Sequence, residues 1–233
     1  MFSVIIPTIR KSGNLDKLIA VYSAHPLVQE VLIVNNSDLP LQNLPSKVRE
    51  IYCGPNLYVN PAWNMGAREA TGEVLALSND DIVIDGGLLD YVAEFLLKKS
   101  VGVVGVGRDS IEEVSVRPRI RRAYTRDLYF GTLMFIPREN YIPVPSDLLI
   151  WCGDDWLFHT QRRENWAVAW PMGSSEMGAS VHSSSRLEDV ARSDKEIWYA
   201  KYWPKLQRRP RIVLKRIANK MKRVLTASDA RRL

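Results

Sequence analysis

The most constraining feature of this sequence is the stretch at 75–81, LALSNDD, in which a short apolar run ends in an amide and two adjacent carboxylates. A continuous apolar run of this length is typical of a strand that is buried on both faces of a parallel sheet. In open α/β sheets, ligands bind beyond the carboxyl ends of such strands, where Asn79, Asp80 and Asp81 would lie. Hard oxygen ligands at this place suit Mg²⁺ or Mn²⁺, usually shared with substrate phosphates. The alternative is an Asn-Asp-Asp turn whose side chains bond their own backbone.

Other apolar runs in the chain predict that this strand belongs to a parallel sheet. Strands at 2–7 and 30–34 enclose a helix at 15–23, for which Asn14 is the expected cap. A strand, a helix and a second strand so close together form a βαβ unit, which implies a parallel α/β sheet. Further strands are expected at 48–52, 73–78, 101–107 and 131–137, with helices at 60–70, 88–99 and 154–163.

The composition is that of a soluble globular chain. Of its 233 residues, 46% are hydrophobic and 25% are charged, which is ordinary for such proteins. The two cysteines, Cys53 and Cys152, have no metal-binding spacing and argue against a disulfide framework, so we expect a reducing compartment. No apolar run approaches the ~20 residues that a membrane span requires. The expected location is the cytoplasm.

Charge divides the chain into two expected parts, a domain at 1–204 and a basic tail at 205–233. The net charge of the whole chain is +6, but the tail has eleven basic residues and one acidic residue, and the domain sums to −4. Apolar residues of the tail fall near one helical face, which is typical of an amphipathic helix. Such a helix suits the anionic inner face of the cytoplasmic membrane, although a solvated or partner-binding helix has the same pattern. A basic tail on a mildly acidic domain does not indicate a nucleic-acid-binding domain.

Polar side chains also follow the second strand, at Asn36 and Asp38. Parallel strands end at the same edge of a sheet, so a nucleotide lying across this edge would meet these residues as well as those at 79–81. A plain turn between strand and helix is the alternative. The stretch at 108–127 is expected to be irregular and contains six arginines, which suits either a lid over a diphosphate or a solvated surface loop.

A second pair of carboxylates, Asp154 and Asp155, lies between Trp151 and Trp156. Aromatic rings beside acids are what a sugar-binding cleft offers, and one carboxylate is then placed to accept a proton from a hydroxyl group. Helix capping is the alternative explanation for one of the two acids. His182, in a serine-rich loop, is either a ligand for the metal at the first acidic cluster or a surface residue.

In this order, the motifs resemble those of the family 2-like glycosyltransferases, which have the GT-A fold, over roughly residues 2–204. Asn79 stands where the family has the first acid of its DxD motif, and Asp154 stands where it has a glutamate. The matching features are two early strands (3–8 and 30–37), an asparagine-rich helix (56–72), the DxD position (78–81), a later strand (131–138), an acidic pair (153–155), a late histidine (His182) and a closing aromatic helix (195–205).

The resemblance implies a GT-A type nucleotide-binding fold, an α/β architecture with a mainly parallel central sheet flanked by helices, followed by the basic helical tail. It implies transfer of a sugar from a nucleotide-diphosphate sugar donor to the hydroxyl group of a glycan or lipid-linked acceptor. The outcome expected at the sugar carbon is inversion. The expected setting is the assembly of cell-surface polysaccharide or glycolipid, with the chain peripheral on the inner membrane face.

The same resemblance implies a role for each candidate residue. Asp155 would be the base that deprotonates the acceptor, with Asp154 as the next candidate. A divalent metal, Mn²⁺ or Mg²⁺, would be bound by Asp81 and His182. Donor contacts are expected from Pro7, Thr8, Arg10, Asn36, Asp38, Asn64, Asn79 and Asp80, and acceptor contacts from Trp151 and Trp156.

Two other functions fit some of these features. A sugar-nucleotide nucleotidyltransferase would use the same sheet edge and acids, but it normally carries a glycine-rich basic loop after the first strand, which 8–13 (TIRKSG) matches only in part. A non-catalytic chain of the same fold would bind nucleotide, or bind nucleic acid through its tail in a salt-sensitive way. Nucleotide-sugar transfer is the preferred interpretation, and nucleic acid is not an expected partner.

Overall fold

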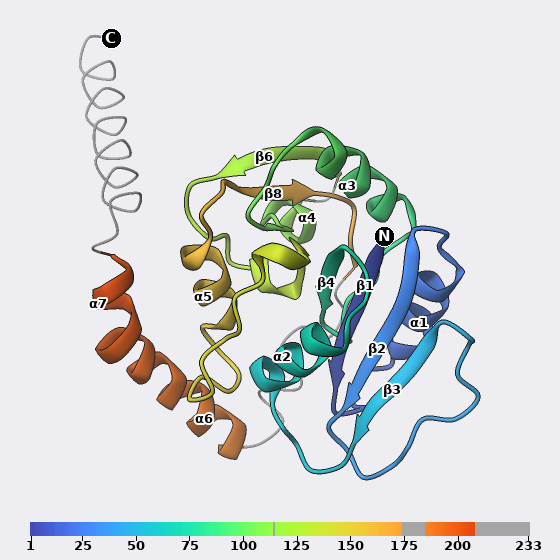
Figure 1. Ribbon diagram of the computed structural model, residues 1–233, viewed down its shortest axis with the longest axis horizontal. Coiled ribbons are helices and arrows are strands. Elements are labelled where there is room, and N and C mark those ends of the chain that lie inside the picture. Colours follow the sequence, from blue (N-terminus) through green and yellow to red (C-terminus); the bar gives the residue numbers. More distant parts are fainter. Residues whose placement is uncertain (114, 174–184, 208–233) are drawn as a thin grey trace.

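The computed structural model describes residues 1–113, 115–173 and 185–207, in which one sheet of eight strands lies between helices (Figure 1). Its first half is parallel, as the βαβ pattern predicted, with the spatial order β3-β2-β1-β4. The side chains of β1 and β2 are buried almost throughout, which is why these strands are near-continuous apolar runs in the sequence. The four strands are β1 (Phe2–Thr8), β2 (Val28–Asn35), β3 (Val48–Cys53) and β4 (Val74–Ser78).

The second half of the sheet is mixed, because β7 (Leu133–Pro137) runs antiparallel to its neighbour β4. The order continues β7-β5-β8-β6, in which β5 (Val104–Val106) is parallel to β8 (Asn165–Ala169). At the edge, β6 (Arg119–Ala123) runs antiparallel to β8. Strands β6 and β8 were not predicted. The predicted α/β class and GT-A architecture are confirmed, with the continuous parallel half formed by β1 to β4.

Helices cover both faces of the sheet, because successive residues of a strand point to opposite sides. Val4 and Ile6 of β1 belong to the core under α1 and α3, whereas Ile5 belongs to the core under α2 and α5. Gly66 of α2 lies against Ile5, where a Cβ would overlap the isoleucine side chain, so α2 sits close to β1. The helices and turns are α1 (Leu15–Ala24), α2 (Val59–Glu69), α3 (Gly87–Lys98), α4 (Asp109–Glu112), η1 (Phe130–Thr132), η2 (Arg138–Asn140) and α5 (Gly153–Thr160).

The described chain ends in a helical segment that packs on the α2 and α5 side of the sheet. It comprises α6 (Ser185–Ile197), a π-helical turn η4 (Trp198–Tyr202) and α7 (Trp203–Leu206). Trp198 and Leu206 are each only 3% exposed, so apolar burial holds the segment in place. The boundary expected after residue 204 falls inside α7, and of the expected tail at 205–233 only residues 205–207 are described. None of the described helices is long and apolar enough to cross a membrane.

Three local expectations differ in part from the structure. The stretch at 108–127 is not irregular throughout, because it contains α4 and β6, and β8 supplies the backbone partners of β6. Asn14 stands at the N-cap position of α1, as expected, but its side chain makes no capping hydrogen bond, and its NH₂ group donates to the backbone carbonyl of Asp81 (3.4 Å). Helix α5 ends at Thr160, and both acids lie inside its first turn, so neither is its N-cap.

Candidate active site

A pocket lies at the carboxyl edge of the parallel strands, where the sequence predicted a ligand. Its walls come from the ends of β1, β2 and β4, the loop that enters α2, the loop before α5, and α6. The lining residues are Pro7, Thr8, Ile9, Asn36, Asn56, Tyr58, Val59, Asn79, Asp80, Asp81, Ile150 and Leu187. Six of the residues expected to contact donor or metal are in this set, so the polar strand ends do meet in space.

A hydrogen bond joins β1 to the acidic cluster that follows β4. Thr8 Oγ1 lies 2.5 Å from Asp80 Oδ2, and both side chains are buried. The backbone N–H of Arg10 also donates to Thr8 Oγ1 (2.9 Å), so the hydroxyl is held between two partners. A bond between side chains 72 residues apart in the sequence argues against the local Asn-Asp-Asp turn, because Asp80 is oriented by β1.

The polar residue after β2 ties the pocket segments together. The N–H of Asn36 donates to the carbonyl of Thr8 (2.7 Å), and its Oδ1 accepts the N–H of Leu57 (2.9 Å). Asn36 therefore connects the end of β1 to the loop that enters α2. A plain strand-to-helix turn would not need this long-range contact. Asn36 lines the pocket, and its role as a donor contact stays a prediction.

Strained backbone gathers around this pocket. Arg10, Tyr58 and Cys152 have positive φ angles of 58°, 67° and 61°, a region that residues other than glycine seldom adopt. Tyr58 lines the pocket, Arg10 follows β1, and Cys152 directly precedes α5. The fourth such residue of the described chain is Asn43, a residue type that tolerates this conformation. Strain of this kind is typical of functional sites, where the surrounding structure fixes it.

The acidic cluster after β4 has the chemistry of a divalent-cation site. Asp80 and Asp81 are 7% and 6% exposed, and both line the pocket. Two carboxylates beside the Asn79 amide suit Mg²⁺ or Mn²⁺ held jointly with diphosphate oxygens. Within the described part of the chain, no three His, Cys, Asp or Glu side chains come together to form a metal site. His182 lies outside the described residues, so its place in the metal site stays a prediction.

The second acidic pair lies in the first turn of α5, where Arg126 binds both carboxylates. Arg126 Nη1 is 2.9 Å from Asp154 Oδ2, and its Nε is 2.7 Å from Asp155 Oδ1. Asp154 Oδ1 also accepts the backbone N–H of Asp155 (2.9 Å), so both oxygens of Asp154 are engaged. No described residue donates a hydrogen bond to Asp155 Oδ2. That oxygen is the acceptor of the pair that remains available to a ligand.

Burial and the neighbouring guanidinium set the charge of this pair. Burial raises the pKa of Asp154 to about 6, although Arg126 acts in the opposite direction. The adjacent Asp155 carboxylate adds to the rise, because two negative charges this close repel each other.

Two glycines allow α5 to approach the sheet edge. A Cβ on Gly131 would lie 2.8 Å from Asp154 Oδ2, and one on Gly153 would overlap a side chain of α2. Gly131 belongs to η1, and the next residue, Thr132, accepts the backbone N–H of Asn79 (2.9 Å). The acidic cluster after β4 and the acidic pair on α5 are therefore neighbours of the same short turn.

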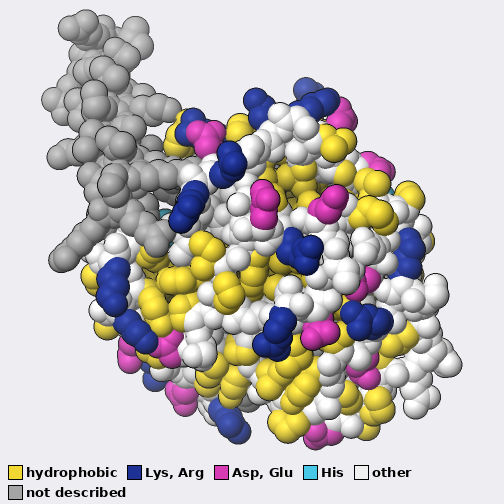
Figure 2. All heavy atoms as spheres, in the orientation of Figure 1, with side chains coloured by type: hydrophobic (Ala, Val, Ile, Leu, Met, Phe, Trp, Pro, Cys, Tyr) yellow, Lys and Arg dark blue, Asp and Glu magenta, His cyan; other side chains and the backbone are white. Residues whose placement is uncertain are grey.

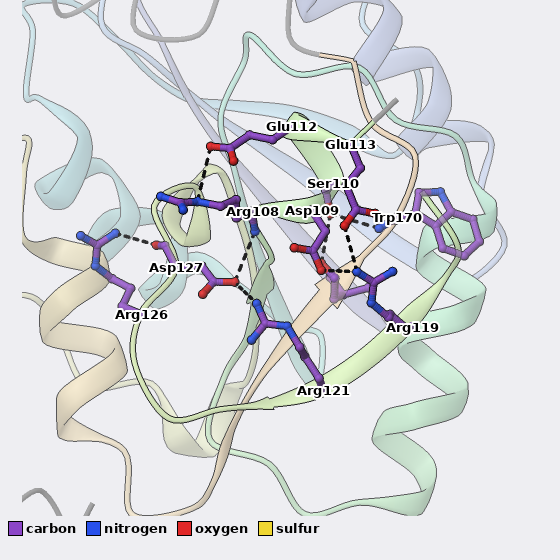
Figure 3. Close-up of polar contacts among 11 residues, drawn as sticks. Arg108, Asp109, Ser110, Glu112, Glu113, Arg119, Arg121, Arg126, Asp127 and Trp170 are labelled. Atoms are coloured by element: carbon purple, nitrogen blue, oxygen red, sulfur yellow. Dashed lines mark hydrogen bonds and ion pairs between the residues drawn. The ribbon is translucent and has the colours of Figure 1, made fainter. Parts of the chain in front are cut away.

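The arginine-rich segment before α5 is an ion-paired scaffold (Figure 3). Arg119 pairs with Asp109 of α4, and Arg121 pairs with Asp127 beyond β6. Arg126 donates to the carbonyl of Asp127 (3.0 Å) and lies on the far side of Asp127 from the other two arginines. The network thus fixes β6 and its turn, and it delivers one arginine to the acidic pair. None of these three arginines lines the pocket, so the diphosphate lid, one of the two roles that the sequence left open, stays a prediction.

Three expected donor residues do not line the pocket. The Arg10 guanidinium donates to a carbonyl of the loop after β2 (2.8 Å), and Asp38 is exposed in that loop. The amide of Asn64 donates to the carbonyl of Val144 (2.8 Å) and accepts from the hydroxyl of Tyr141 (2.8 Å). Asn64 therefore ties α2 to the loop before α5, and its role as a donor contact stays a prediction.

The two tryptophans expected at the acceptor have different surroundings. Trp151 is 39% exposed, and the Lys195 ammonium lies 4.7 Å from its ring centroid. Trp156 donates its indole N–H to the carbonyl of Ile142 (3.3 Å) and packs edge-on against Tyr202. Trp151 is thus open to a ligand, whereas Trp156 joins α5 to the C-terminal helices. Their roles as acceptor contacts stay predictions.

Sequence reasoning missed two charged residues of this region, Arg126 and Asp194. Arg126 meets its acid partner 29 residues later, and Asp194 bonds backbone groups 43 to 45 residues earlier. No local spacing pairs groups so far apart. A signal for Asp194 was present, because it shares a helical face with Ala191 and Trp198, where an acid among buried residues needs a partner.

Comparison with known proteins agrees with this architecture. The model of glycosyl transferase family 2 matches residues 3–156, and a search of curated proteins finds no match. The chain is similar to the crystal structure of S. aureus TarS 1-349, with a TM-score of 0.53 and 12% identity over 90% of this chain and 75% of that one. It is also similar to a crystal structure of S. aureus TarS, with a TM-score of 0.51 and 18% identity over 71% of this chain and 35% of that one.

The two kinds of match carry different weight. At these identities the likeness to TarS shows the fold alone, and the chain spans only 35% of the second TarS structure. The family match runs from β1 into the first turn of α5 and includes both acidic clusters. The chain therefore belongs to glycosyl transferase family 2.

Proposed function

We propose that this protein transfers a sugar from a nucleotide-diphosphate sugar to an acceptor hydroxyl group, with inversion at the sugar carbon. The observation that carries the proposal is the pairing of two acidic clusters across η1. Asp80 and Asp81 line a pocket at the ends of three parallel strands, and Asp154 and Asp155 lie on the other side of the turn. One cluster suits a diphosphate with its cation, and the other suits a hydroxyl group that must lose a proton.

The pocket residues would bind the nucleotide-sugar donor. Pro7, Thr8 and Asn36 would frame the nucleoside at the ends of β1 and β2. Asp81, with Asp80 and the amide of Asn79 beside it, would hold Mn²⁺ or Mg²⁺. When bound, such an ion neutralises the charge that accumulates on the leaving diphosphate. We propose His182 as an additional ligand of this ion.

Asp155 would act on the acceptor as the general base. Its Oδ1 is fixed by Arg126, and its Oδ2 would take the proton of the acceptor hydroxyl group. The freed oxygen forms its bond to the sugar carbon while the bond from that carbon to the diphosphate breaks on the opposite face. General-base help of this kind contributes ~10²–10⁴-fold to a rate. Each oxygen of Asp154 already accepts a hydrogen bond, so Asp154 mainly holds Arg126 and the turn and is the second candidate for the base.

Two substitutions separate the donor and acceptor roles. A thermal-shift screen of UDP-, GDP- and dTDP-sugars, with and without Mn²⁺, first identifies the donor of the wild-type protein. With that donor, we expect Asp155→Asn to lower kcat by about 10²-fold or more while the affinity for the nucleoside diphosphate stays unchanged. We expect Asp81→Ala to lose the part of the nucleoside diphosphate affinity that depends on Mn²⁺, measured by titration calorimetry.

Other outcomes would point elsewhere. Near-full turnover by Asp155→Asn contradicts the assignment of the base and moves it to Asp154. Release of pyrophosphate from a nucleoside triphosphate and a sugar phosphate would indicate a nucleotidyltransferase. As a control, Asp16→Asn removes an acid of α1 that neither lines the pocket nor belongs to the acidic pair, and both measurements should match the wild type.

A further inference from the structure

A buried acid of α6 binds the loop that leads into the acidic pair. Asp194 is 1% exposed, and its carboxylate accepts three consecutive backbone N–H groups. Leu149 donates to Oδ1 at 2.9 Å, and Ile150 and Trp151 donate to Oδ2 at 2.6 and 2.8 Å. Charge-assisted bonds of this kind are about twice as strong as neutral ones, and together they offset the cost of burying the carboxylate.

The same loop is held from the opposite side by α2. The amide of Asn60 donates to the carbonyls of Leu148 and Trp151, both at 3.1 Å, and its backbone N–H donates to the carbonyl of Leu149 (2.9 Å). Asn60 therefore binds carbonyl groups of the loop, whereas Asp194 binds its N–H groups. A loop whose peptide groups are fixed from two helices has little freedom to shift.

This loop connects the two halves of the candidate site. Ile150 lines the pocket, and two residues later Cys152 adopts a positive φ of 61° immediately before α5. The acids of the pair lie in the next turn. Any displacement of the loop would move the pocket wall and the start of α5 together. The anchor on α6 lies outside residues 3–156, which match the family model, so the family pattern does not include it.

We propose that Asp194 is a positioning residue, which docks α6 on the 149–151 loop and thereby fixes Ile150 in the pocket and Asp155 on α5. The inference rests on the proposed function for the role of Asp155. Its structural part, the control of the loop by α6, stands on the contacts alone. The C-terminal helices are then a component of the active site, and they do more than cover the sheet.

The matched variants are Asp194→Asn and Asp189→Asn. Asparagine keeps the size of Asp194 but replaces one acceptor oxygen by an NH₂ group, so the loop N–H groups lose a partner. Asp189 lies on the same helix with 68% of its side chain exposed, and it pairs only with Arg192 among the described residues. We expect hydrogen exchange of the 149–151 amides to rise about tenfold or more in Asp194→Asn, the effect of losing a bond to a charged group. Exchange in β1 and β2 should stay unchanged in both variants.

Kinetics then separate positioning from plain stability. We expect kcat of Asp194→Asn to fall about tenfold or more with a smaller change in the donor KM, as for an interaction that orients the base. Asp189→Asn should match the wild type in exchange and in kcat. Faster exchange at 149–151 with unchanged kcat would overturn the proposal, and so would unchanged exchange.

Two further arms keep the test decisive. If Asp194→Asn does not fold, Lys195→Met is the second variant, because it removes the charge over the Trp151 ring. Hydrogen exchange of the 149–151 amides should then rise about threefold, as expected for the loss of one cation–π contact. No change in this exchange would overturn the docking of α6. If the wild type transfers no sugar, the proposed function fails, and UDP alone becomes the probe. Slower exchange at 149–151 on addition of UDP in the wild type, but not in Asp194→Asn, then supports the positioning role, and an equal response overturns it.

Discussion

At the start of α5, two adjacent carboxylates share one guanidinium and differ in how many of their oxygens remain available. Asp154 uses one oxygen for Arg126 and the other for a backbone N–H, whereas Asp155 uses one for Arg126. The two acids are therefore not equivalent. Asp155 has an oxygen available to act as a base, whereas Asp154 supports Arg126. The difference can be measured through pH dependence, because Asp154 is the acid whose pKa is raised.

We expect Asp154→Asn to change the pH dependence of stability. Burial raises the pKa of Asp154 from its ordinary value of 3.8 to about 6, so the folded chain binds this proton more tightly than the unfolded chain does. The stability linked to the proton is fully present below about pH 4 and is lost as the pH rises through about 6. Asparagine does not titrate, so between about pH 4 and about pH 7 the variant should gain on the order of 2–3 kcal/mol relative to the wild type.

Urea unfolding at a series of pH values measures this difference directly. The free energy of unfolding of the variant minus that of the wild type cancels the other titrating groups, which both proteins share. Asp16→Asn, which replaces an exposed acid of α1 that has no ion pair among the described residues, serves as a control whose difference should stay flat across the same range. A flat difference for Asp154→Asn as well would show that Asp154 keeps an ordinary pKa in the folded protein.

The sequence predicted the strand-end residues of the site but could not predict those contributed from elsewhere. Asp81 and Asn36 follow strands whose apolar runs are evident, and parallel strands bring such ends to one edge. Asn64 lies away from the pocket lining, because an asparagine-rich helix does not reveal which amides face the pocket and which tie the helix to a loop. Arg126 and Asp194 reach the site through the tertiary fold, so only the structure pairs them with their partners.

At the scale of elements, the turn η1 sets the distance between the acidic cluster after β4 and helix α5. Its contact with α5 is at Gly131, where a Cβ would lie 2.8 Å from Asp154 Oδ2 and 2.9 Å from Asp154 Cβ. Both distances are shorter than ordinary carbon contacts, so a larger residue must displace Asp154 or the turn. A glycine at this place is therefore required by the close approach of two elements.

We expect Gly131→Ala to cost about 1–3 kcal/mol of stability, the usual penalty for overpacking, and to lower kcat more than it lowers donor affinity. The displaced Asp154 would no longer hold Arg126, and Asp155 would lose its orientation. Gly13→Ala is the matched control, because a Cβ there meets no atom within 4 Å. Wild-type stability and turnover in Gly131→Ala would show that η1 adapts without moving the acids.

The elements that the sequence missed are those with the weakest apolar pattern. Strand β6, RIRRA, is an edge strand whose arginines are half-buried or exposed, so its sequence pattern is typical of a polar loop. Charged side chains on an edge strand also prevent pairing with other chains. Strand β8 has only five residues and follows a polar turn. The early strands were predictable because helices bury both of their faces.

At the scale of the whole molecule, positive charge is concentrated outside the described domain. Residues 1–207 carry a net charge of −3, and residues 208–233 carry +9. Figure 2 shows basic and acidic side chains interspersed on the viewed face of the domain, with apolar surface between them. That face therefore presents no broad basic surface, and the sequence concentrates positive charge at 208–233.

We expect truncation after Gln207 to abolish binding to anionic vesicles while leaving nucleoside diphosphate affinity intact. Leu206 is buried and the N–H of Gln207 bonds to the carbonyl of Trp203, so the truncation keeps the last anchored turn of the domain. Each basic residue near an anionic surface contributes about 1 kcal/mol, so even a few of the ten basic residues at 208–233 change the bound fraction more than tenfold. Co-sedimentation with phosphatidylserine vesicles measures this, and phosphatidylcholine vesicles are the control.

The salt dependence of the same experiment separates the possible partners of the tail. Charge attraction to a lipid surface weakens as salt shortens the screening length from about 14 Å near 0.05 M to about 4 Å near 0.5 M, whereas an inserted apolar helix face resists salt. Partial retention on anionic vesicles at high salt would therefore indicate an amphipathic helix lying in the interface. Equal sedimentation of the full and truncated chains would exclude membrane docking by the tail. Binding to DNA that falls steeply with salt, without vesicle binding, would assign the tail to nucleic acid instead.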